Sequence, residues 1–378
     1  MRQLFQILYD HHTDIVLNAH NKQYERFAPQ NPQGVADPNG IREFVVGTGG
    51  LGHDPFDTIA ANSEVRNNTA FGVLKLSLGA GQYSWQFLPV AGQSFTDSGT
   101  GTCHSAQPQG ATLYAAGDIP TCSNGKPNPN AAATAALIGP TGTVAPLGDL
   151  IAENGAPADF ANCYGPAWGK YKSRTRPTVG NHEDTGTVAT AYYNYFGAAA
   201  GPAGKGYYSY DLGTWHVVVL NANCSVVPGG CGAGSPQETW LKADLAAHPA
   251  TCTLAYWHQP LFTSGAVHPG ATDMRPMWQD LYNAGAEIVL NGHSHQYERF
   301  APQTPTGAAD QAHGIREFVV GTGGVSHYAF GTIAANSQVR NNTTFGVLKL
   351  TLNPGSYSWK FLPVAGKTFT DSGTGTCH

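Results

Sequence analysis

The chain contains a long internal repeat, because residues 1–104 recur as residues 274–378. The copies align with an offset of 273 up to the loop at Ala36 and of 274 after a one-residue gap, and 73 of 104 paired positions are identical. Two long copies are unlike the many short units of a solenoid. Met1 aligns with Met274, inside a running sequence, so we expect the first copy to begin partway through a fold.

The repeat divides the 378 residues into three parts. We expect residues 1–104 to be a partial duplicate that lacks most of the fold, and residues 111–378 to be a complete unit. Residues 105–110 are predicted to be a linker, because the segment HSAQPQGAT is polar and contains glycine and proline. At about 150 residues per domain, this length suits two or three units.

Composition restricts the possible functions. Charged residues make up only 12% of the chain and the net charge is -5, which argues against a nucleic-acid partner. With 47 Gly and 25 Pro, the chain stays below the roughly 25–30% of a disordered protein, so we expect a loop-rich globular fold. No stretch approaches about 18 apolar residues, and the start, MRQLFQILYDHH, lacks the apolar core of a signal peptide, so we expect neither membrane association nor an export signal in this sequence.

Within residues 111–378, short apolar runs repeatedly end in residue types that bind metal ions. The runs are ATLYAAGD, GTVAPLGD, RTRPTVGNHE, CTLAYWHQP and AEIVLNGHSH. They deliver these candidates in order: Asp118, Asp149, Asn181 with its neighbour His182, His258, and His293 with His295. Helical patterns alternate with the runs, as in a layered α/β fold. In such folds ligands bind beyond the carboxyl ends of the strands, where we expect these side chains to meet.

Two Asp, one Asn and three His form a mixed oxygen and nitrogen ligand set. Such a set suits two ions about 3.5–4 Å apart, bridged by one carboxylate. Each motif alone is weak, because Gly-Asp pairs are common in turns and a histidine near a strand end is usually structural. Five motifs in order, each after a strand, favour a metal centre. Iron, zinc and manganese all suit these ligands, so the metal identity stays open.

These blocks resemble, in order, those of the calcineurin-like metallophosphoesterases. The closest resemblance is to the purple-acid-phosphatase-like branch, whose terminal motif GHxHxYER stands here as GHSHQYER at residues 292–299. The resemblance covers about residues 111–378. It implies a four-layer α/β sandwich, two mixed β-sheets flanked by helices, preceded here by a partial repeat of its C-terminal third.

The resemblance also implies a role for each candidate. The first metal would be held by Asp118, Asp149 and His295. The second would be held by Asp149 as the bridge, together with Asn181, His258 and His293. The neighbour of Asn181, His182, resembles the family residue that contacts the substrate phosphate and protonates the leaving group.

The implied reaction is metal-dependent hydrolysis of small phosphomonoesters by a metal-bound water or hydroxide at a binuclear centre. The leaving alkoxide needs a proton, which a histidine can supply at about pH 5–7. Two alternatives stay open. The same centre could hydrolyse phosphodiesters, or the chain could be a catalytically impaired relic that binds metal and phosphate.

The chain departs from the family pattern at the first metal. Ala152 stands where purple acid phosphatases have a tyrosine ligand, and Pro120 stands where other calcineurin-like enzymes have a histidine. Water or Glu153 would then complete the site. We expect weaker occupancy of the first site and no intense visible band from an iron–tyrosinate pair.

The first copy departs further, because its equivalent of GHSH reads AHNK. His20 aligns with His293, but Lys22 replaces His295, and a protonated amine has no lone pair for a metal. We expect residues 1–104 to be an incomplete duplicate without activity. The alternative is that this copy competes with the second copy for docking on the middle part of the chain, either within one chain or in a domain-swapped dimer. A monomer and a swapped dimer therefore both stay possible.

Seven cysteines, several of them in loops, favour an oxidising compartment. The resemblance implies a secreted or periplasmic protein with disulfides Cys122–Cys163 and Cys224–Cys231, and with Cys252–Cys377 as a third. Cys103, the repeat of Cys377, is the surplus thiol, which would be free or would compete for the partner of Cys377.

Other recurring residues favour structural roles. Tyr297, Glu298 and Arg299 also occur in the first copy, and the GTGG turn at 321–324 has no strong helix signal behind it. His216 lies in an apolar run at the edge of the core. Three loop histidines near the predicted site are candidates for substrate contact: His268, His313 and His327.

Overall fold

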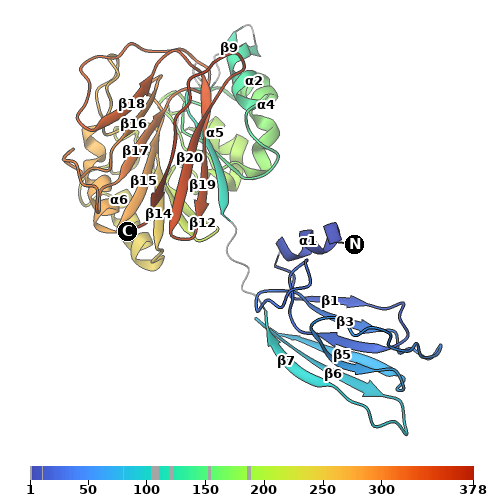
Figure 1. The fold of residues 1–378 in the computed structure, drawn as a ribbon. Helices are drawn as coiled ribbons and strands as arrows, with labels where there is room; N and C mark the ends of the chain where they lie inside the picture. Colours follow the sequence, from blue (N-terminus) through green and yellow to red (C-terminus); the bar gives the residue numbers. More distant parts are fainter. Residues whose placement is uncertain are drawn as a thin grey trace. The chain divides into compact units, whose positions relative to one another are not determined.

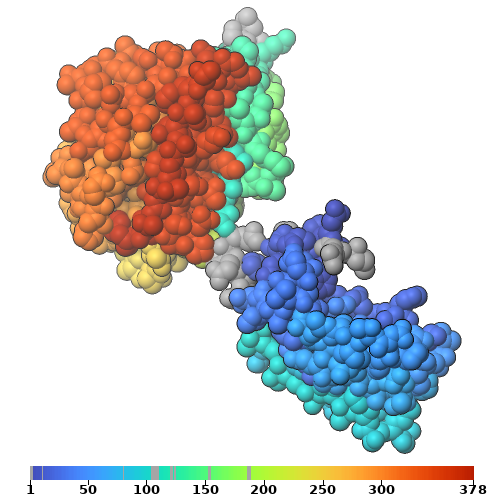
Figure 2. All heavy atoms as spheres, in the orientation of Figure 1, coloured from blue at the N-terminus to red at the C-terminus, as the bar shows by residue number. Residues whose placement is uncertain are grey.

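The computed structural model describes residues 2–10, 12–79, 81–103, 110–119, 122–123, 125–151, 155–184 and 189–378. Most of the predicted linker, residues 105–110, lies outside this part of the chain. The chain forms two compact units, Met1–Pro108 and Gln109–His378 (Figures 1 and 2). Each unit has a hydrophobic core of its own.

A seven-stranded mixed sheet forms one half of the second unit, in the order β12-β13-β14-β15-β17-β16-β18. Its strands are β12 (Tyr208–Leu212), β13 (Trp215–Val219), β14 (Cys252–Tyr256), β15 (Ala286–Asn291), β16 (Tyr297–Phe300), β17 (Arg316–Val320) and β18 (Ser337–Asn341). β13, β14, β15 and β17 run parallel, and the first three are buried along their whole length, as their Val- and Leu-rich sequences predict.

A five-stranded sheet forms the other half, in the order β11-β8-β19-β20-β21. Its strands are β8 (Ala111–Ala116), β11 (Thr143–Pro146), β19 (Gly346–Asn353), β20 (Ser356–Pro363) and β21 (Ser372–Thr376). β8 pairs in parallel with β11 and antiparallel with β19. A separate two-stranded ribbon contains β9 (Cys122–Ser123) and β10 (Lys126–Pro127). Parallel pairing of β8 and β11 places their carboxyl ends side by side.

Helices cover the outer faces of both sheets (Figure 1). Beside the five-stranded sheet lie α2 (Pro129–Ala135), α3 (Pro157–Asp159), α4 (Gly165–Ala167) and α5 (Thr190–Phe196), with helical turns at Phe160–Tyr164, Gly169–Arg174 and Gly197–Ala200. Beside the seven-stranded sheet lie α6 (Pro236–Ala247), α7 (Arg275–Asn283) and a turn at Thr272–Met274. Alternate strand residues point to opposite faces. On β13, Val217 joins the core between the sheets, whereas Val218 packs under the α6 and α7 helices. The predicted four-layer fold is confirmed.

The first unit has two smaller sheets, in the orders β1-β3-β2-β4 and β5-β6-β7. Its elements are α1 (Arg2–Asp10), β1 (Ile15–Asn18), β2 (Tyr24–Phe27), β3 (Arg42–Val46), β4 (Ser63–Asn67), β5 (Gly72–Gly79), β6 (Gln82–Pro89) and β7 (Ser98–Thr102). β1 pairs with β3 in the register that β15 and β17 use, since Ile15 faces Arg42 as Ile288 faces Arg316. β5 has β6 as its neighbour, whereas its equivalent β19 also pairs with β8.

The repeated Tyr-Glu-Arg motif has the same structural role in both units. Asp371 accepts hydrogen bonds from the Tyr297 hydroxyl (2.7 Å), Arg299 Nε (2.7 Å) and Trp359 Nε1 (3.1 Å). In the first unit Asp97 accepts the same bonds, over the same distances, from Tyr24, Arg26 and Trp85. In the second unit these bonds connect β16 with β20 and with the segment between β20 and β21. In the first unit they connect β2 with β6 and with the segment between β6 and β7.

The three predicted disulfides, Cys122–Cys163, Cys224–Cys231 and Cys252–Cys377, are confirmed. Cys103 has a free thiol. Among the helices of the described residues, none has the length and apolar composition that a bilayer crossing requires.

Candidate metal centre

The candidate ligands of the second unit follow the carboxyl ends of neighbouring strands. Asp118 comes two residues after β8, and Asp149 comes three residues after its parallel neighbour β11. The two turns hold each other, because the Asp118 N–H donates to the Gly148 carbonyl (3.1 Å) and the Ile119 N–H donates to the Asp149 carbonyl (3.0 Å). His258 follows β14, and His293 follows β15.

Three candidates have left-handed backbone, with φ of 60° at Asp118, 48° at Asp149 and 65° at His293. The glycine before each one has no room for a side chain. A Cβ at Gly148 would lie 2.5 Å from His258 Nδ1, and a Cβ at Gly292 would lie 2.9 Å from Asp118 Oδ2. The Gly-Asp and Gly-His pairs therefore bring the strand ends close enough for their side chains to meet.

Asp149, His258 and His293 form a compact group whose ligand atoms all lie within 4.8 Å of one another. Asp149 Oδ2 lies 3.0 Å from His258 Nε2, and that nitrogen lies 3.2 Å from His293 Nδ1. Two tetrahedral ligand nitrogens at about 2.0–2.1 Å from zinc would be about 3.3 Å apart. His258 Nδ1 lies 2.7 Å from the Leu147 carbonyl, which fixes the proton there and leaves the Nε2 lone pair for an ion.

Asn181 and His182 lie on the other side of Asp149. The Asn181 Oδ1 atom is buried and accepts no hydrogen bond from the described residues. The His182 N–H donates to Asp149 Oδ1 (3.0 Å), and its Nε2 lies 3.8 Å from Asp149 Oδ2. The His182 side chain is 41% exposed, so its ring lies at the rim, where a substrate can reach it.

Asp118 and His295 form the first candidate site. Asp118 Oδ1 lies 3.2 Å from His295 Nε2, and Asp118 Oδ2 accepts the His293 N–H (2.8 Å). His295 Nδ1 pairs with Ser326 Oγ (2.7 Å), which orients its other nitrogen toward Asp118. The residues expected to decide how this site is completed, Pro120, Ala152 and Glu153, lie outside the described part of the chain.

Strong pKa shifts accompany this crowding in the metal-free protein. Burial opposes charge on Asp149, but His258 and His182 outweigh it and lower the carboxyl pKa. Burial also opposes charge on His258, yet Asp149 raises its pKa to about 9. Burial and the neighbouring His258 lower the pKa of His293 to about 2. Burial, with the charge of Asp149, raises the pKa of Glu183 to about 7.

The donor set fits two cations. It combines carboxylate, amide and imidazole donors, which suit borderline divalent and trivalent ions. Buried oxygens of Asp118 and Asn181 accept no hydrogen bond in the described structure, and an ion would satisfy both. Asp149 Oδ2 faces His258, while its Oδ1 accepts the His182 backbone N–H, which fixes the orientation of the carboxylate.

A second group, His216, Asp244 and His248, does not converge in the same way. The His216 and His248 rings are stacked, with centroids 4.8 Å apart and planes 10° apart. Imidazole lone pairs lie in the ring plane, so stacked rings cannot direct them at one ion. The buried His216 ring instead lies between the exposed Asp211 (3.1 Å from Nδ1) and the buried Asp244 (2.9 Å from Nε2).

Two aromatic rings at the centre complete the site. His268 packs on His293 with centroids 4.1 Å apart, and Tyr328 stacks on His295 at 3.9 Å. The other two loop histidines contact different residues: His327 stacks on Phe345 and His313 contacts His378.

Sequence reasoning missed Tyr328, although the repeat contains a signal for it. Ala19, Asn21, Lys22 and Asp54 stand in the first copy where the second has Gly292, Ser294, His295 and Tyr328. A comparison of the copies next to the candidate ligands would have drawn attention to Tyr328.

Known proteins resemble the second unit. Residues 116–297 match the family described as Calcineurin-like phosphoesterase. Purple acid phosphatase 15 of Arabidopsis thaliana is 29% identical over 182 residues, which cover 40% of this chain and 33% of that protein. Purple acid phosphatase 23 of the same plant is 32% identical over 151 residues, 35% of this chain and 32% of that protein. The chain thus spans about a third of the length of these relatives.

A solved structure agrees with the fold. Purple acid phosphatase PPD1 from yellow lupin (Lupinus luteus) seeds matches with a TM-score of 0.58 at 17% identity, covering 93% of this chain and 69% of that one. At this identity the likeness concerns the fold. The second unit of this chain therefore contains a calcineurin-like phosphoesterase match at residues 116–297 and is similar in sequence and fold to purple acid phosphatases.

Proposed function

We propose that the second unit is a metal-dependent hydrolase of phosphoric esters that acts on small phosphomonoesters at a binuclear centre. The convergence of donor side chains from successive strand ends on Asp149 is the observation that supports it most. When bound, the two ions supply a nucleophilic water and neutralise charge on the phosphoryl oxygens.

The residues of this chain would divide the remaining work. Asp149, oriented by the His182 N–H, would hold both ions in place. The Leu147 carbonyl and Ser326 would fix the ring orientations of His258 and His295. His182, at the rim, would donate a proton to the leaving oxygen.

The disulfides support a location for this activity. Three disulfides connect segments of the second unit, and such bonds persist in oxidising environments. We therefore propose that the protein is secreted or periplasmic. Detection of the intact disulfides in protein isolated from its natural source, with thiols blocked before lysis, tests this location.

The test of function uses a matched pair of substitutions that the repeat provides. His293→Ala removes a candidate ligand, whereas His20→Ala makes the same change at the equivalent position of the first unit. We expect His293→Ala to lower turnover of p-nitrophenyl phosphate by about a hundredfold or more, because loss of a residue that only supports a metal ligand already costs about 10–100-fold, and His20→Ala to leave it unchanged.

The same assay separates the alternatives. Faster turnover of bis(p-nitrophenyl) phosphate than of the monoester would replace the phosphomonoesterase proposal with a phosphodiesterase. Absence of turnover of either ester with iron, zinc or manganese added would contradict the proposed hydrolase and favour the binding relic.

A further inference from the structure

A cavity of about 340 Å³ opens beside the candidate ligand Asn181. Its other walls come from the loop that follows β13, residues 222–226, from Gln259 after β14, and from Asp273 in the turn before α7. This volume suits a small molecule. Because Asn181 belongs to both the cavity and the candidate centre, a group in the cavity would lie next to the reacting phosphate.

The cavity has an acidic lining. Asp184 and Asp273 both line it, and its lining residues include no lysine, arginine or histidine. Asp184 is only 8% exposed, and its Oδ1 atom accepts no hydrogen bond from the described residues. The Asp184 carboxyl also accepts the Ala189 backbone N–H. Burial disfavours its negative charge, and a positively charged group in the cavity would offset that cost by electrostatic attraction.

A second lining residue also has an unused acceptor. Gln259 Nε2 donates to Asn223 Oδ1 (2.9 Å), so the orientation of the Gln259 amide is fixed by that bond. Its Oε1 atom is buried and accepts no hydrogen bond in the described part of the chain. The cavity therefore has two carboxyl groups and an amide of fixed orientation in its walls.

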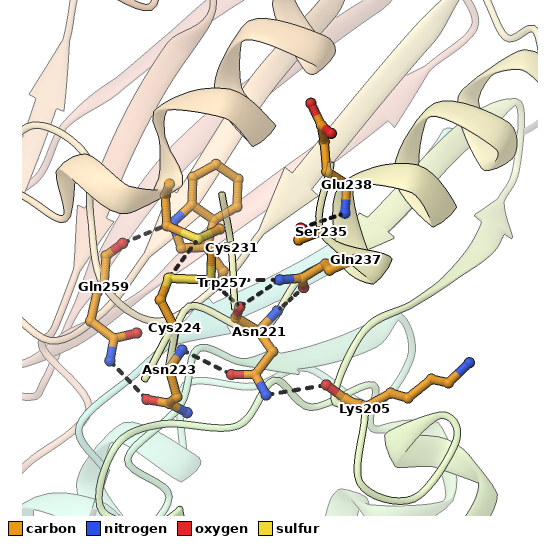
Figure 3. The surroundings of a disulfide bond; sticks show 11 residues. Lys205, Asn221, Asn223, Cys224, Cys231, Ser235, Gln237, Glu238, Trp257 and Gln259 are labelled. Atoms are coloured by element: carbon orange, nitrogen blue, oxygen red, sulfur yellow. Dashed lines mark hydrogen bonds between the residues drawn. A yellow bond between two sulfur atoms is a disulfide. The ribbon is translucent and has the colours of Figure 1, made fainter. Parts of the chain in front are cut away.

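Hydrogen bonds and a disulfide hold the wall of the cavity around Asn223 (Figure 3), and one further hydrogen bond connects it to the centre. Asn223 Nδ2 donates to the carbonyl of Gly180, the residue before Asn181 (3.1 Å), and its backbone N–H donates to Asn221 Oδ1 (2.9 Å). The disulfide between Cys224 and Cys231 closes the loop behind it. A wall fixed in this way binds a ligand with little loss of conformational entropy.

We propose that this cavity binds the alcohol part of the substrate and selects phosphomonoesters whose alcohol has a positively charged ammonium group. The inference rests on the proposed hydrolysis at the metal centre. The ions would hold the phosphate, while Asp184 and Asp273 would attract the ammonium group at the other end.

Three esters of similar size and different charge test the selection: O-phosphoethanolamine, n-propyl phosphate and phosphoglycolate. We expect kcat/KM to be about fivefold higher for the ammonium ester than for the neutral one, as partly exposed ion pairs permit, and lowest for the carboxylate. The ratio of ammonium to neutral ester should approach one at about 1 M salt, because salt screens charge.

Substitutions in the full chain assign the effect to the cavity. Asp273 is exposed, so Asp273→Asn should fold and should lower the ammonium-to-neutral ratio to below about twofold; Asp184→Asn should do the same. Asp57→Asn makes the same charge change at an exposed residue that does not line the cavity, and should change neither the ratio nor the turnover.

Hydrolysis of p-nitrophenyl phosphate distinguishes failure of the cavity assignment from failure of the proposed function. If that ester is hydrolysed but the ammonium ester has no advantage, or Asp273→Asn leaves the advantage intact, the assignment of the cavity is wrong. If no ester is hydrolysed with metals supplied, the proposed function is wrong and the substrate preference falls with it.

Discussion

Left-handed backbone at Asp118, Asp149 and His293 turns each side chain back over the end of its strand. Such a conformation costs about 1–3 kcal/mol per residue, although Asp and His tolerate it better than most. These unfavourable backbone conformations lie where the donor side chains meet, as is common at functional sites. The glycine that precedes each residue is what permits the close approach.

Gly292→Ala tests this packing. The new Cβ would lie 2.7 Å from the Leu147 carbonyl and 2.9 Å from Asp118 Oδ2, so the strand ends must separate. We expect kcat/KM for p-nitrophenyl phosphate to fall at least tenfold and the melting temperature to drop. Gly232→Ala, which meets nothing within 4 Å, is the control and should change neither. Equal kinetics for both variants would show that the close approach is not required.

Glu317 gives stability a pH dependence away from the centre. Burial raises the pKa of this carboxyl well above its usual range, and nearby Glu298 adds to the rise. The unfolded chain releases the proton near pH 4.5, whereas the folded protein keeps it to higher pH. The folded state then binds more protons, so the free energy of unfolding falls as pH rises, by up to about 1.4 kcal/mol per pH unit.

Glu317→Gln removes this titration. Relative to the unaltered protein, the variant should gain stability as pH is raised from about 4.5 toward neutrality, measured by thermal unfolding at several pH values. Glu43→Gln, the equivalent change in the first unit, should leave the pH dependence of the second unit's transition unchanged. A constant difference between the variant and the unaltered protein across this range would show that Glu317 does not titrate as described.

At the scale of elements, the disulfides differ in how much chain they close. Cys252–Cys377 links β14 to the segment after β21 across 125 residues, whereas Cys224–Cys231 spans 7. Loop-closure entropy predicts about 4–5 kcal/mol of stabilisation for the first and about 2 kcal/mol for the second. Replacing both cysteines of each pair by alanine should show this order in urea unfolding. Equal losses would contradict the entropic account.

The strand ends of the second unit were predictable from sequence because each ligand follows a buried apolar run. Asp118 and His258 need only that pattern and the parallel order of the strands. The only sequence signal for Tyr328 was the difference between the two copies at that position. The cavity wall at Asn223 and Asp273 was not predictable, because loops from distant parts of the chain bring these residues together. The periodic pattern of apolar residues in the sequence does not indicate where such loops meet.

At the scale of the molecule, the first unit exposes strand residues whose equivalents in the second unit are buried. Leu78 on β5 is 77% exposed, whereas its equivalent Leu352 on β19 is 1% exposed, because β19 also pairs with β8. Val73 on β5 is exposed as well, although its equivalent Val347 is buried. An exposed apolar edge strand is a template for pairing, so we expect β5 of one copy to pair with β5 of another.

Leu78→Lys tests this association. The charged side chain should reduce self-association in sedimentation velocity and change stability by no more than about 0.5 kcal/mol. Leu352→Lys places the same charge in the core of the second unit and should destabilise it by about 3 kcal/mol or more. Unchanged self-association in Leu78→Lys would exclude the β5 edge.

The most direct test of the whole account is the metal content of the purified protein, measured by elemental analysis after loading with iron, zinc or manganese and removal of free ions. We expect close to two ions per chain, with turnover of p-nitrophenyl phosphate lost on chelation and restored when metal is added back. Asp149→Ala should lower the metal content and abolish the turnover, because Asp149 lies against His258 in the candidate centre and is the proposed bridging ligand. One ion or none per chain, with no turnover after metal addition, would contradict a binuclear hydrolase.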